Sequence, residues 1–276
     1  MVSPQAIPTI RLNNGVEMPQ LGLGVYKAKE GEEVKNAVRW AIEAGYRHID
    51  TAALYENETG VGEAIRESGV PREEIFVTTK VWNTDQGYEK TLKAFETSRK
   101  KLGFDYVDLY LVHWPGRDKF VDTYRALEKL LAEGLVRAIG VSNFKEHHLE
   151  RLLQETDIVP AVNQVEFHPR LQQKSLHAYC KAKGIALEAW APLMKGNLDH
   201  PVLLRLAEKY GKTPAQVVLR WHIQLGVIAI PKSVRRERIV SNADIFDFEL
   251  TAKEMADIGA MDENHRYGMD PDEFLF

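Results

Sequence analysis

The chain has 276 residues, which is close to the size of one (β/α)8 barrel and would also suffice for two average domains. Its 36 Lys and Arg against 40 Asp and Glu give a net charge of −4, which excludes the basic field that attracts nucleic acid or an anionic membrane. A single cysteine, Cys180, excludes an internal disulfide and a cysteine-rich metal site and suits a reducing cytoplasm. No apolar stretch approaches the roughly 20 residues that span a bilayer, and Met1–Ile10 lacks the pattern of a signal peptide.

The first predicted element is a β-hairpin. Asn13-Asn14-Gly15 separates the short segments Thr9–Leu12 and Val16–Met18, and an Asn-Gly pair between such segments predicts a tight turn with positive φ at both turn positions. Strand-like and helix-like segments then alternate every thirty residues or a little less, roughly the length of a βαβ unit. Eight strands are predicted, at Leu21–Val25, His48–Asp50, Ile75–Thr79, Val107–Val112, Val136–Val141, Ala161–Glu166, Ala186–Ala191 and Val227–Ile230.

The segments between these strands have the period of amphipathic helices. The clearest are Glu33–Ala44, Tyr124–Glu133 and Pro214–Gln224, the last preceded by Thr213 as a helix cap. Glycines in position to end helices in a left-handed conformation are Gly45, Gly103, Gly134 and Gly184. Eight strand–helix units without a break in composition predict one domain over residues 1–276, a (β/α)8 TIM barrel preceded by the hairpin and followed by a short tail.

Reactive side chains fall where predicted strands end, which is where barrels of this kind build their active sites. Asp50, Lys80 and His113 end the second, third and fourth strands, and Tyr55 follows Asp50 closely. Each of these residues alone is more often structural, but their convergence on one rim predicts a catalytic site.

The residue types indicate which chemistry this rim performs. A tyrosine has a pKa near ~10 and is a poor proton donor at neutral pH, but a nearby ammonium lowers that pKa. Asp50 is positioned to hold Lys80 charged, and His113 to orient a carbonyl oxygen toward Tyr55. Such a site protonates an oxygen as negative charge develops on it. No side chain donates hydride, so a nicotinamide or flavin is implied.

Several segments resemble the aldo-keto reductases. They are Gly45–Ala52 followed by Tyr55, Thr78–Trp82, Asp108–Pro115, Gly140–Phe144, Asn163-Gln164 and Ile230–Val234. The resemblance runs from the hairpin to the last residues and is greatest to bacterial members that reduce glyoxal and methylglyoxal. It implies NADPH-dependent reduction of small aldehydes and ketones to alcohols, with Asp50, Tyr55, Lys80 and His113 as the catalytic tetrad and Tyr55 as the general acid.

The resemblance also implies a binding site for NADPH or NADP⁺. Ser142, Asn143 and Gln164 match the positions that hydrogen-bond the nicotinamide carboxamide, and Trp190 matches an aromatic residue that stacks on the nicotinamide ring. Further cofactor contacts are implied for Leu193, Lys232, Ser233, Val234, Arg235, Arg238 and Asn242. Lys232, Arg235, Arg236 and Arg238 also form a basic cluster after the eighth strand, where barrel enzymes often bind phosphate, so we expect a clamp for the 2′-phosphate with Arg236 pointing outward.

The substrate pocket is expected among aromatic side chains near the tetrad. Tyr26, Trp82 and Trp114 are predicted to wall it together with His113, and the tail Tyr267–Phe276 to close one side. We expect a small carbonyl compound as substrate, a cytoplasmic monomer, no metal, and no nucleic-acid or membrane partner.

Two alternatives stay open and two are disfavoured. Diketo sugar acids, aldoses or bulkier ketones could be the substrates, and an NADPH-binding redox sensor with negligible turnover is a second class of function. The Tyr179–Lys183 pair has the spacing seen in short-chain dehydrogenases, but Gly60–Ile65 is an incomplete dinucleotide fingerprint that does not follow a strand. His147-His148 lacks the spacing of a metal-dependent hydrolase.

Overall fold

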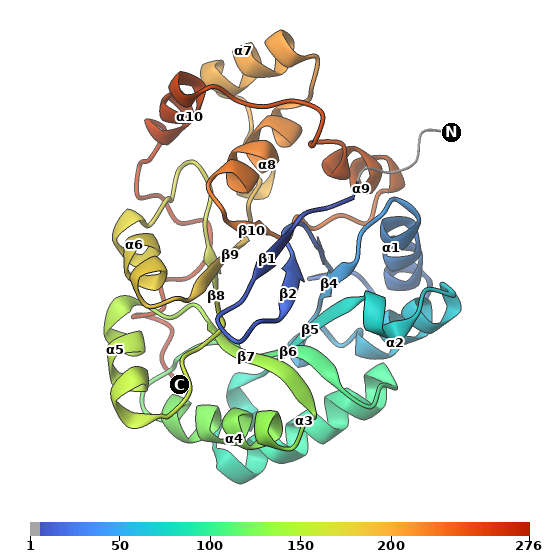
Figure 1. Cartoon of the computed structure of the whole chain (residues 1–276), viewed down its shortest axis with the longest axis vertical. Helices are drawn as coiled ribbons and strands as arrows, with labels where there is room; N and C mark the ends of the chain where they lie inside the picture. The colour runs from blue at the N-terminus through green and yellow to red at the C-terminus, as the bar shows by residue number, and fades with distance from the viewer. Residues whose placement is uncertain (1–5) are drawn as a thin grey trace.

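The computed structural model describes residues 6–276 and has a ring of parallel strands at its centre (Figure 1). An antiparallel hairpin, β1 (Thr9–Arg11) and β2 (Glu17–Pro19), precedes this ring. The eight parallel strands are β3 (Leu23–Gly24), β4 (His48–Asp50), β5 (Phe76–Val81), β6 (Val107–Val112), β7 (Val136–Ser142), β8 (Val162–Glu166), β9 (Ala186–Trp190) and β10 (Ile228–Ala229).

The helices form an outer layer around the strands. They are α1 (Glu32–Glu43), α2 (Glu58–Glu67), α3 (Tyr88–Leu102), α4 (Phe120–Ala132), α5 (Glu146–Glu155), α6 (Lys174–Ala182), α7 (Pro201–Tyr210), α8 (Pro214–Gln224), α9 (Arg236–Ala243) and α10 (Ala252–Gly259). Figure 1 shows this ring of helices around the strands, and the eight strands appear in the order of the eight predicted segments.

Hydrogen bonds between the first and last strands close the sheet. The amide of Gly22 donates to Ala229 (2.9 Å), that of Ala229 to Gln20 (2.9 Å), and that of Gly24 to Pro231 (3.2 Å). A sheet closed in this way has no free edge. The prediction of a (β/α)8 barrel is therefore confirmed, while the prediction that all of residues 1–276 form one domain stays a prediction.

Local sequence signals account for helix α8 and for the glycines predicted to end helices. Helix α8 begins at Pro214 and ends at Gln224 as predicted, because Thr213 and Gln216 each accept a hydrogen bond from the backbone of the other. Helix α4 begins at Phe120, earlier than predicted, and its cap Lys119 makes no side-chain hydrogen bond that could have marked the start. The predicted left-handed glycines all have positive φ, between 73° and 100°, namely Gly45, Gly103, Gly134 and Gly184.

The hairpin forms with a turn different from the predicted one. Only Gly15 has a positive φ (88°), so the expectation of two consecutive positive φ values was wrong. The Gly15 amide donates to Leu12 (2.9 Å) and the Leu12 amide to Val16 (2.8 Å), which makes a three-residue loop with glycine in the left-handed position. Asn13 and Asn14 use their side chains instead, donating to carbonyls beside the starts of β8 and β7. The hairpin thus closes the amino-terminal end of the barrel and leaves the carboxyl end open.

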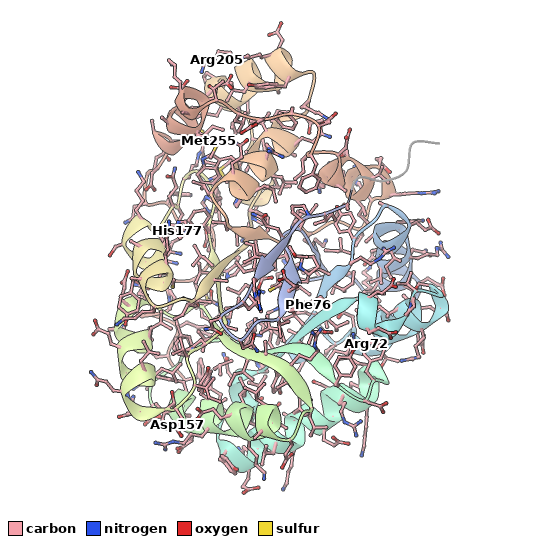
Figure 2. The ribbon with its side chains drawn as sticks, in the orientation of Figure 1. Arg72, Phe76, Asp157, His177, Arg205 and Met255 are labelled. Atoms are coloured by element: carbon pink, nitrogen blue, oxygen red, sulfur yellow. The ribbon has the colours of Figure 1, made fainter. Side chains whose placement is uncertain are left out.

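Alternation along each strand separates the inside of the barrel from the layer under the helices. Leu109 and Leu111 on β6 are buried inside and point to the same side as His113. They pack with residues from the hairpin and other strands, among them Met18 and Phe76. Figure 2 shows Phe76 near the centre of the molecule, whereas Arg205, on an outer helix, lies at its periphery. This apolar plug fills the lower barrel, and the strand ends that carry the predicted tetrad lie above it.

Two glycines in helices give a test of the packing. In α2, a Cβ added at Gly62 would lie 1.9 Å from the Leu102 carbonyl oxygen, whereas one added at Gly259 in α10 would meet nothing within 4 Å. We expect Gly62→Ala to lower the free energy of unfolding by about 1–3 kcal/mol, because α2 and α3 must move apart. Gly259→Ala should leave it unchanged or raise it by up to about 1 kcal/mol. Urea denaturation of both variants measures this, and equal effects would contradict the packing described.

No helix among residues 6–276 is long and apolar enough to cross a membrane. The prediction that Met1–Ile10 is no signal peptide falls in part on residues 1–5, which lie outside the described residues.

Candidate active site

The four residues of the predicted tetrad lie together at the carboxyl end of the barrel. Asp50 ends β4, Lys80 lies near the end of β5, His113 follows β6, and Tyr55 ends a short 3₁₀ turn after β4. Lys80 Nζ donates to Asp50 Oδ1 (2.6 Å), to the Thr51 carbonyl (2.9 Å) and to the Tyr55 hydroxyl (3.2 Å). These three acceptors use all three N–H groups of the ammonium and fix its position.

The charge of Lys80 is set by two opposing effects. Burial lowers the pKa of its ammonium, but the Asp50 charge and the hydrogen bonds to Asp50 and Tyr55 outweigh burial and raise that pKa above its ordinary value. Lys80 is therefore charged at any physiological pH, and Asp50 is the group that keeps it so.

Tyr55 differs from the sequence-based expectation. Desolvation raises the pKa of its hydroxyl, and this exceeds the lowering by Lys80, so the net direction is upward. The expectation that Lys80 brings the pKa of Tyr55 below its ordinary value was thus wrong in sign, because the burial of the hydroxyl could not be judged from the sequence. Tyr55 is a protonated phenol at neutral pH, which is the form that a proton donor requires.

His113 is a neutral imidazole beside Tyr55. Burial, and to a lesser extent the Lys80 charge, hold the pKa of His113 well below its usual value. Its ring meets the rings of Tyr55 and Trp82 edge-on, with centroids 5.9 and 5.2 Å apart. A neutral imidazole donates one hydrogen bond without adding a charge, and so suits the orientation of a carbonyl oxygen.

The residues predicted to hold the nicotinamide lie next to the tetrad in one hydrogen-bond network. Ser142 Oγ donates to the Gln164 carbonyl (2.7 Å), Asn143 Nδ2 to the His113 carbonyl (3.0 Å), and Trp190 Nε1 to Asn143 Oδ1 (2.8 Å). Gln164 Nε2 donates to Asp50 Oδ2 (2.7 Å), which leaves Gln164 Oε1 without a hydrogen bond to any of residues 6–276. An amide oxygen open beside an indole ring fits a carboxamide, so the donor set suits a nicotinamide.

The predicted phosphate clamp extends from the segment after β10 into the first turn of α9. Lys232, Arg235 and Arg238 are exposed and form no ion pair with another described residue. Arg236 instead lies 3.8 Å from Glu43 and points outward, as expected. Ser233 and Asn242 are buried beside the clamp, and Val234 and Leu193 are partly buried. Three unpaired cations on one short segment fit a phosphate group.

Aromatic side chains from four parts of the chain surround the open side of the tetrad. The Tyr26 ring is half exposed and lies 5.2 Å from the Tyr55 ring. Phe274 of the tail lies 4.8 Å from Trp114 and 6.4 Å from Trp82, between ring centroids. The tail therefore covers one side of this pocket, as expected, although the sequence did not single out Phe274.

Further contacts that the sequence did not reveal hold the tail in place. The Glu166 carboxylate accepts hydrogen bonds from the amides of Tyr267 and Gly268, both at 2.8 Å. A Cβ at Gly268 would lie 2.3 Å from the Trp190 ring, so glycine lets the tail pack directly on this indole. At the end of the tail, Phe276 packs on Gly116 in the same way. The only sequence signal is the place of Glu166, two residues beyond Gln164 on β8.

The disfavoured motifs have structural explanations. Tyr179 lies on α6 in the outer layer, where Lys183 Nζ approaches its ring at 5.7 Å, away from the tetrad. Gly62 lies in α2, packed directly against Leu102 at the end of α3. His147 contacts Asp272 of the tail at 2.7 Å, and Lys145 Nζ occupies the other oxygen of that carboxylate at 2.6 Å.

The chain is similar to known proteins over nearly its whole length. The Aldo/keto reductase family model matches residues 20–263. Glyoxal reductase of Bacillus subtilis (strain 168) is 61% identical over 269 residues, covering 97% of this chain and 98% of that protein. The 9,11-endoperoxide prostaglandin H2 reductase of Trypanosoma cruzi (strain CL Brener) is 60% identical over 270 residues, covering 96% of this chain and 95% of that protein.

A solved structure gives the same result. An aldo-keto reductase of Bombyx mori in complex with NADP has a TM-score of 0.91 and 41% identity to this chain, and the alignment covers 97% of this chain and 96% of that one. The predictions of the barrel, of an enzyme that uses NADPH and of a likeness to glyoxal reductases agree with these findings. The chain belongs to the aldo/keto reductase family.

Proposed function

We propose that this enzyme reduces small aldehydes and ketones, such as glyoxal and methylglyoxal, to alcohols with NADPH, and that Tyr55 is the general acid. The observation that carries the proposal is the contact of one buried ammonium, Lys80 Nζ, with both Asp50 and the Tyr55 hydroxyl. When bound, NADPH supplies the hydride, which no side chain of the protein can donate.

The geometry of the tetrad supports Tyr55 as the proton donor. Reduction of a carbonyl group would place negative charge on its oxygen, and Tyr55 would transfer its hydroxyl proton to that oxygen. The resulting phenolate forms 3.2 Å from the Lys80 ammonium, which stabilises it, and Asp50 keeps that ammonium charged. His113 orients the oxygen as a neutral donor. In the reverse direction the Tyr55 phenolate is the base.

The cofactor site extends from the tetrad to the basic clamp. Ser142, Asn143 and Gln164 are proposed to bind the carboxamide and Trp190 to stack on the nicotinamide. Lys232, Arg235 and Arg238 are proposed to bind the 2′-phosphate, with Leu193, Ser233, Val234 and Asn242 lining the adenosine end. The absence of competing ion pairs at these cations among residues 6–276 supports this assignment.

The pocket supports a small substrate. Tyr26, Trp82, Trp114 and Phe274 narrow the space above Tyr55, and glyoxal reductase is a 61% identical relative. Since another relative of nearly equal identity is named for a much larger substrate, identity alone does not fix the substrate. We further propose a monomer in the cytoplasm, where the free buried thiol of Cys180 stays reduced.

The test is the loss of NADPH absorbance in the presence of methylglyoxal, with glyoxal, an aldose, a diketo sugar acid and a bulky ketone compared by kcat/KM. We expect the two small dicarbonyls to have the highest values. Tight NADPH binding with no oxidation by any of these compounds would contradict the proposal and favour a redox sensor.

Cofactor choice tests the clamp. We expect Arg238→Ala or Lys232→Gly to raise the Kd for NADPH by about 10- to 100-fold and to leave that for NADH nearly unchanged, because only NADPH has the 2′-phosphate. Arg236→Ala is the matched control, since Arg236 faces Glu43 and should bind neither cofactor. Fluorescence titration measures all these constants. Equal losses for both cofactors would mean that the clamp faces only water.

A further inference from the structure

A buried acid that the proposed mechanism does not use lies inside the barrel below the tetrad. Glu188 is on β9, in register with Gln164 on β8 and Ile228 on β10, and its side chain is fully buried. Neither carboxyl oxygen has a hydrogen bond of good geometry among residues 6–276, although the Gln164 side chain lies close enough to lower the pKa of Glu188 slightly. His48 Nε2 of β4 lies 3.6 Å from Glu188 Oε1, and it too lacks a partner there.

The other side of the His48 ring fixes its proton. His48 Nδ1 lies 3.1 Å from the Pro19 carbonyl oxygen, and because a carbonyl only accepts, Nδ1 carries hydrogen. The Nε2 of a neutral ring then presents a lone pair to Glu188. Two neighbours pack closely on the ring: Gly22, where an added Cβ would lie 2.5 Å from Nδ1, and Phe76, whose ring meets His48 edge-on at 5.3 Å.

These contacts require one proton between the two side chains. A carboxylate facing an imidazole lone pair in a buried site has no counter-charge and no hydrogen bond, which is costly. Either a neutral acid donates to a neutral ring, or a carboxylate accepts from an imidazolium. Burial raises the pKa of Glu188 to about 8 and lowers that of His48 to about 4, so the proton resides on Glu188 at neutral pH.

The pair is connected to the tetrad on two sides. His48 and Asp50 are two residues apart on β4 and point to the same side. Gln164, which lies beside Glu188, donates to Asp50. The charged or titratable groups that act on the pair are Asp50 from β4, Lys80 from β5 and, for His48, Asp108 from β6.

We propose that Glu188 and His48 share one proton and so set the charge below the tetrad, which makes Glu188 a positioning residue for Asp50, Lys80 and Tyr55. The inference rests on the proposed function of Tyr55. While the proton is present, Asp50 is the carboxylate that acts most strongly on Lys80. When alkaline pH removes it, the additional negative charge disfavours the Tyr55 phenolate. Tyr55 then keeps its proton to higher pH than it would without Glu188.

The kinetic test is the pH dependence of kcat for methylglyoxal reduction in Glu188→Gln. An amide has the shape of the protonated acid and can donate to His48 Nε2 in its place, but it never becomes negative. We expect kcat at pH 6.5 within about twofold of the wild-type value, and the alkaline loss of activity to begin about one pH unit lower. Glu208→Gln, an exposed residue of α7, is the matched control and should leave the profile unchanged.

A second measurement counts the shared proton without any catalysis. Unfolding of the wild type should release one more proton than unfolding of Glu188→Gln between about pH 5 and pH 8, because Glu188 is protonated in the folded state and ionised in the unfolded state there. Buried histidines such as His48 and His222, whose pKa values burial lowers, take up protons on unfolding in both proteins, so the free energy of unfolding of the wild type should fall relative to that of the variant as pH rises. The free energies are measured by urea denaturation at each pH, which also reports whether the variant folds.

The outcomes separate the possible failures. If the variant and the wild type release equal numbers of protons, the shared proton is disproved. If proton release differs but the kinetic profiles coincide, the pair is only structural and the positioning role is overturned. If the wild type reduces no carbonyl compound, the proposed function fails, and the positioning role with it, while the proton count still stands or falls alone.

Discussion

Replacing Tyr55 with phenylalanine is expected to lower kcat for carbonyl reduction by about 100- to 10,000-fold and to leave the affinity for NADPH unchanged. The substitution removes only the hydroxyl. The ring keeps its neighbours Tyr26 and His113, and Lys80 keeps its hydrogen bonds to Asp50 and Thr51. The loss therefore reports the missing proton donor.

Steady-state kinetics and a cofactor titration measure the two quantities separately. Tyr179→Phe is the matched control, because Tyr179 on α6 belongs to the competing Tyr-x-x-x-Lys pair and should change kcat by less than about twofold. A Tyr55→Phe enzyme with near wild-type turnover would mean that another group, or water, protonates the product oxygen.

The raised pKa of Tyr55 also gives the direction of the pH dependence. Since burial outweighs the effect of Lys80, the phenol stays protonated through neutral and mildly alkaline pH. Tyr55 can therefore donate its proton in carbonyl reduction throughout this pH range. The rate of alcohol oxidation, which needs the Tyr55 phenolate as a base, should increase as pH rises.

Replacing Lys80 with methionine is expected to lower the free energy of unfolding by about 3–5 kcal/mol, because it leaves the buried Asp50 carboxylate without its cation. Turnover should fall as well. The effect should be larger for alcohol oxidation than for reduction, since the ammonium is what stabilises the Tyr55 phenolate.

A double variant separates the two effects of Lys80. Adding Asp50→Asn to Lys80→Met removes the unpaired charge and should recover most of the stability in urea denaturation, but none of the activity. Recovery of turnover together with stability would show that Lys80 acts only through folding.

Elements that begin with a clear local capping signal could be predicted from the sequence. Helix α8 is the clearest case, with Thr213 and Pro214 at its start. The start of α4 could not be placed, because Lys119 offers no capping side chain. The backbone conformation of the hairpin turn was predicted wrongly because the side chains of the two asparagines donate hydrogen bonds to carbonyls beside the starts of β8 and β7. These contacts exist only in the folded barrel.

Some contacts of the candidate site could be predicted from the sequence and others could not. Asp50, Lys80 and His113 could be brought together because parallel strands place their carboxyl ends on one rim. The contact between His48 and Glu188 joins residues 140 positions apart and depends on the closure and stagger of the barrel, which no local pattern encodes. Burial of the Tyr55 hydroxyl, which sets the direction of its pKa, depends on packing by residues distant in sequence, such as Tyr26 and His113.

The placement of the tail determines how the enzyme can be handled. A purification tag or surface linker fused after Phe276 begins at a ring that packs on Gly116, next to Phe274 in the pocket wall. Kinetic constants of such a fusion protein would include the effect of the tag on substrate entry. The hairpin lies at the opposite end of the barrel from these aromatic residues.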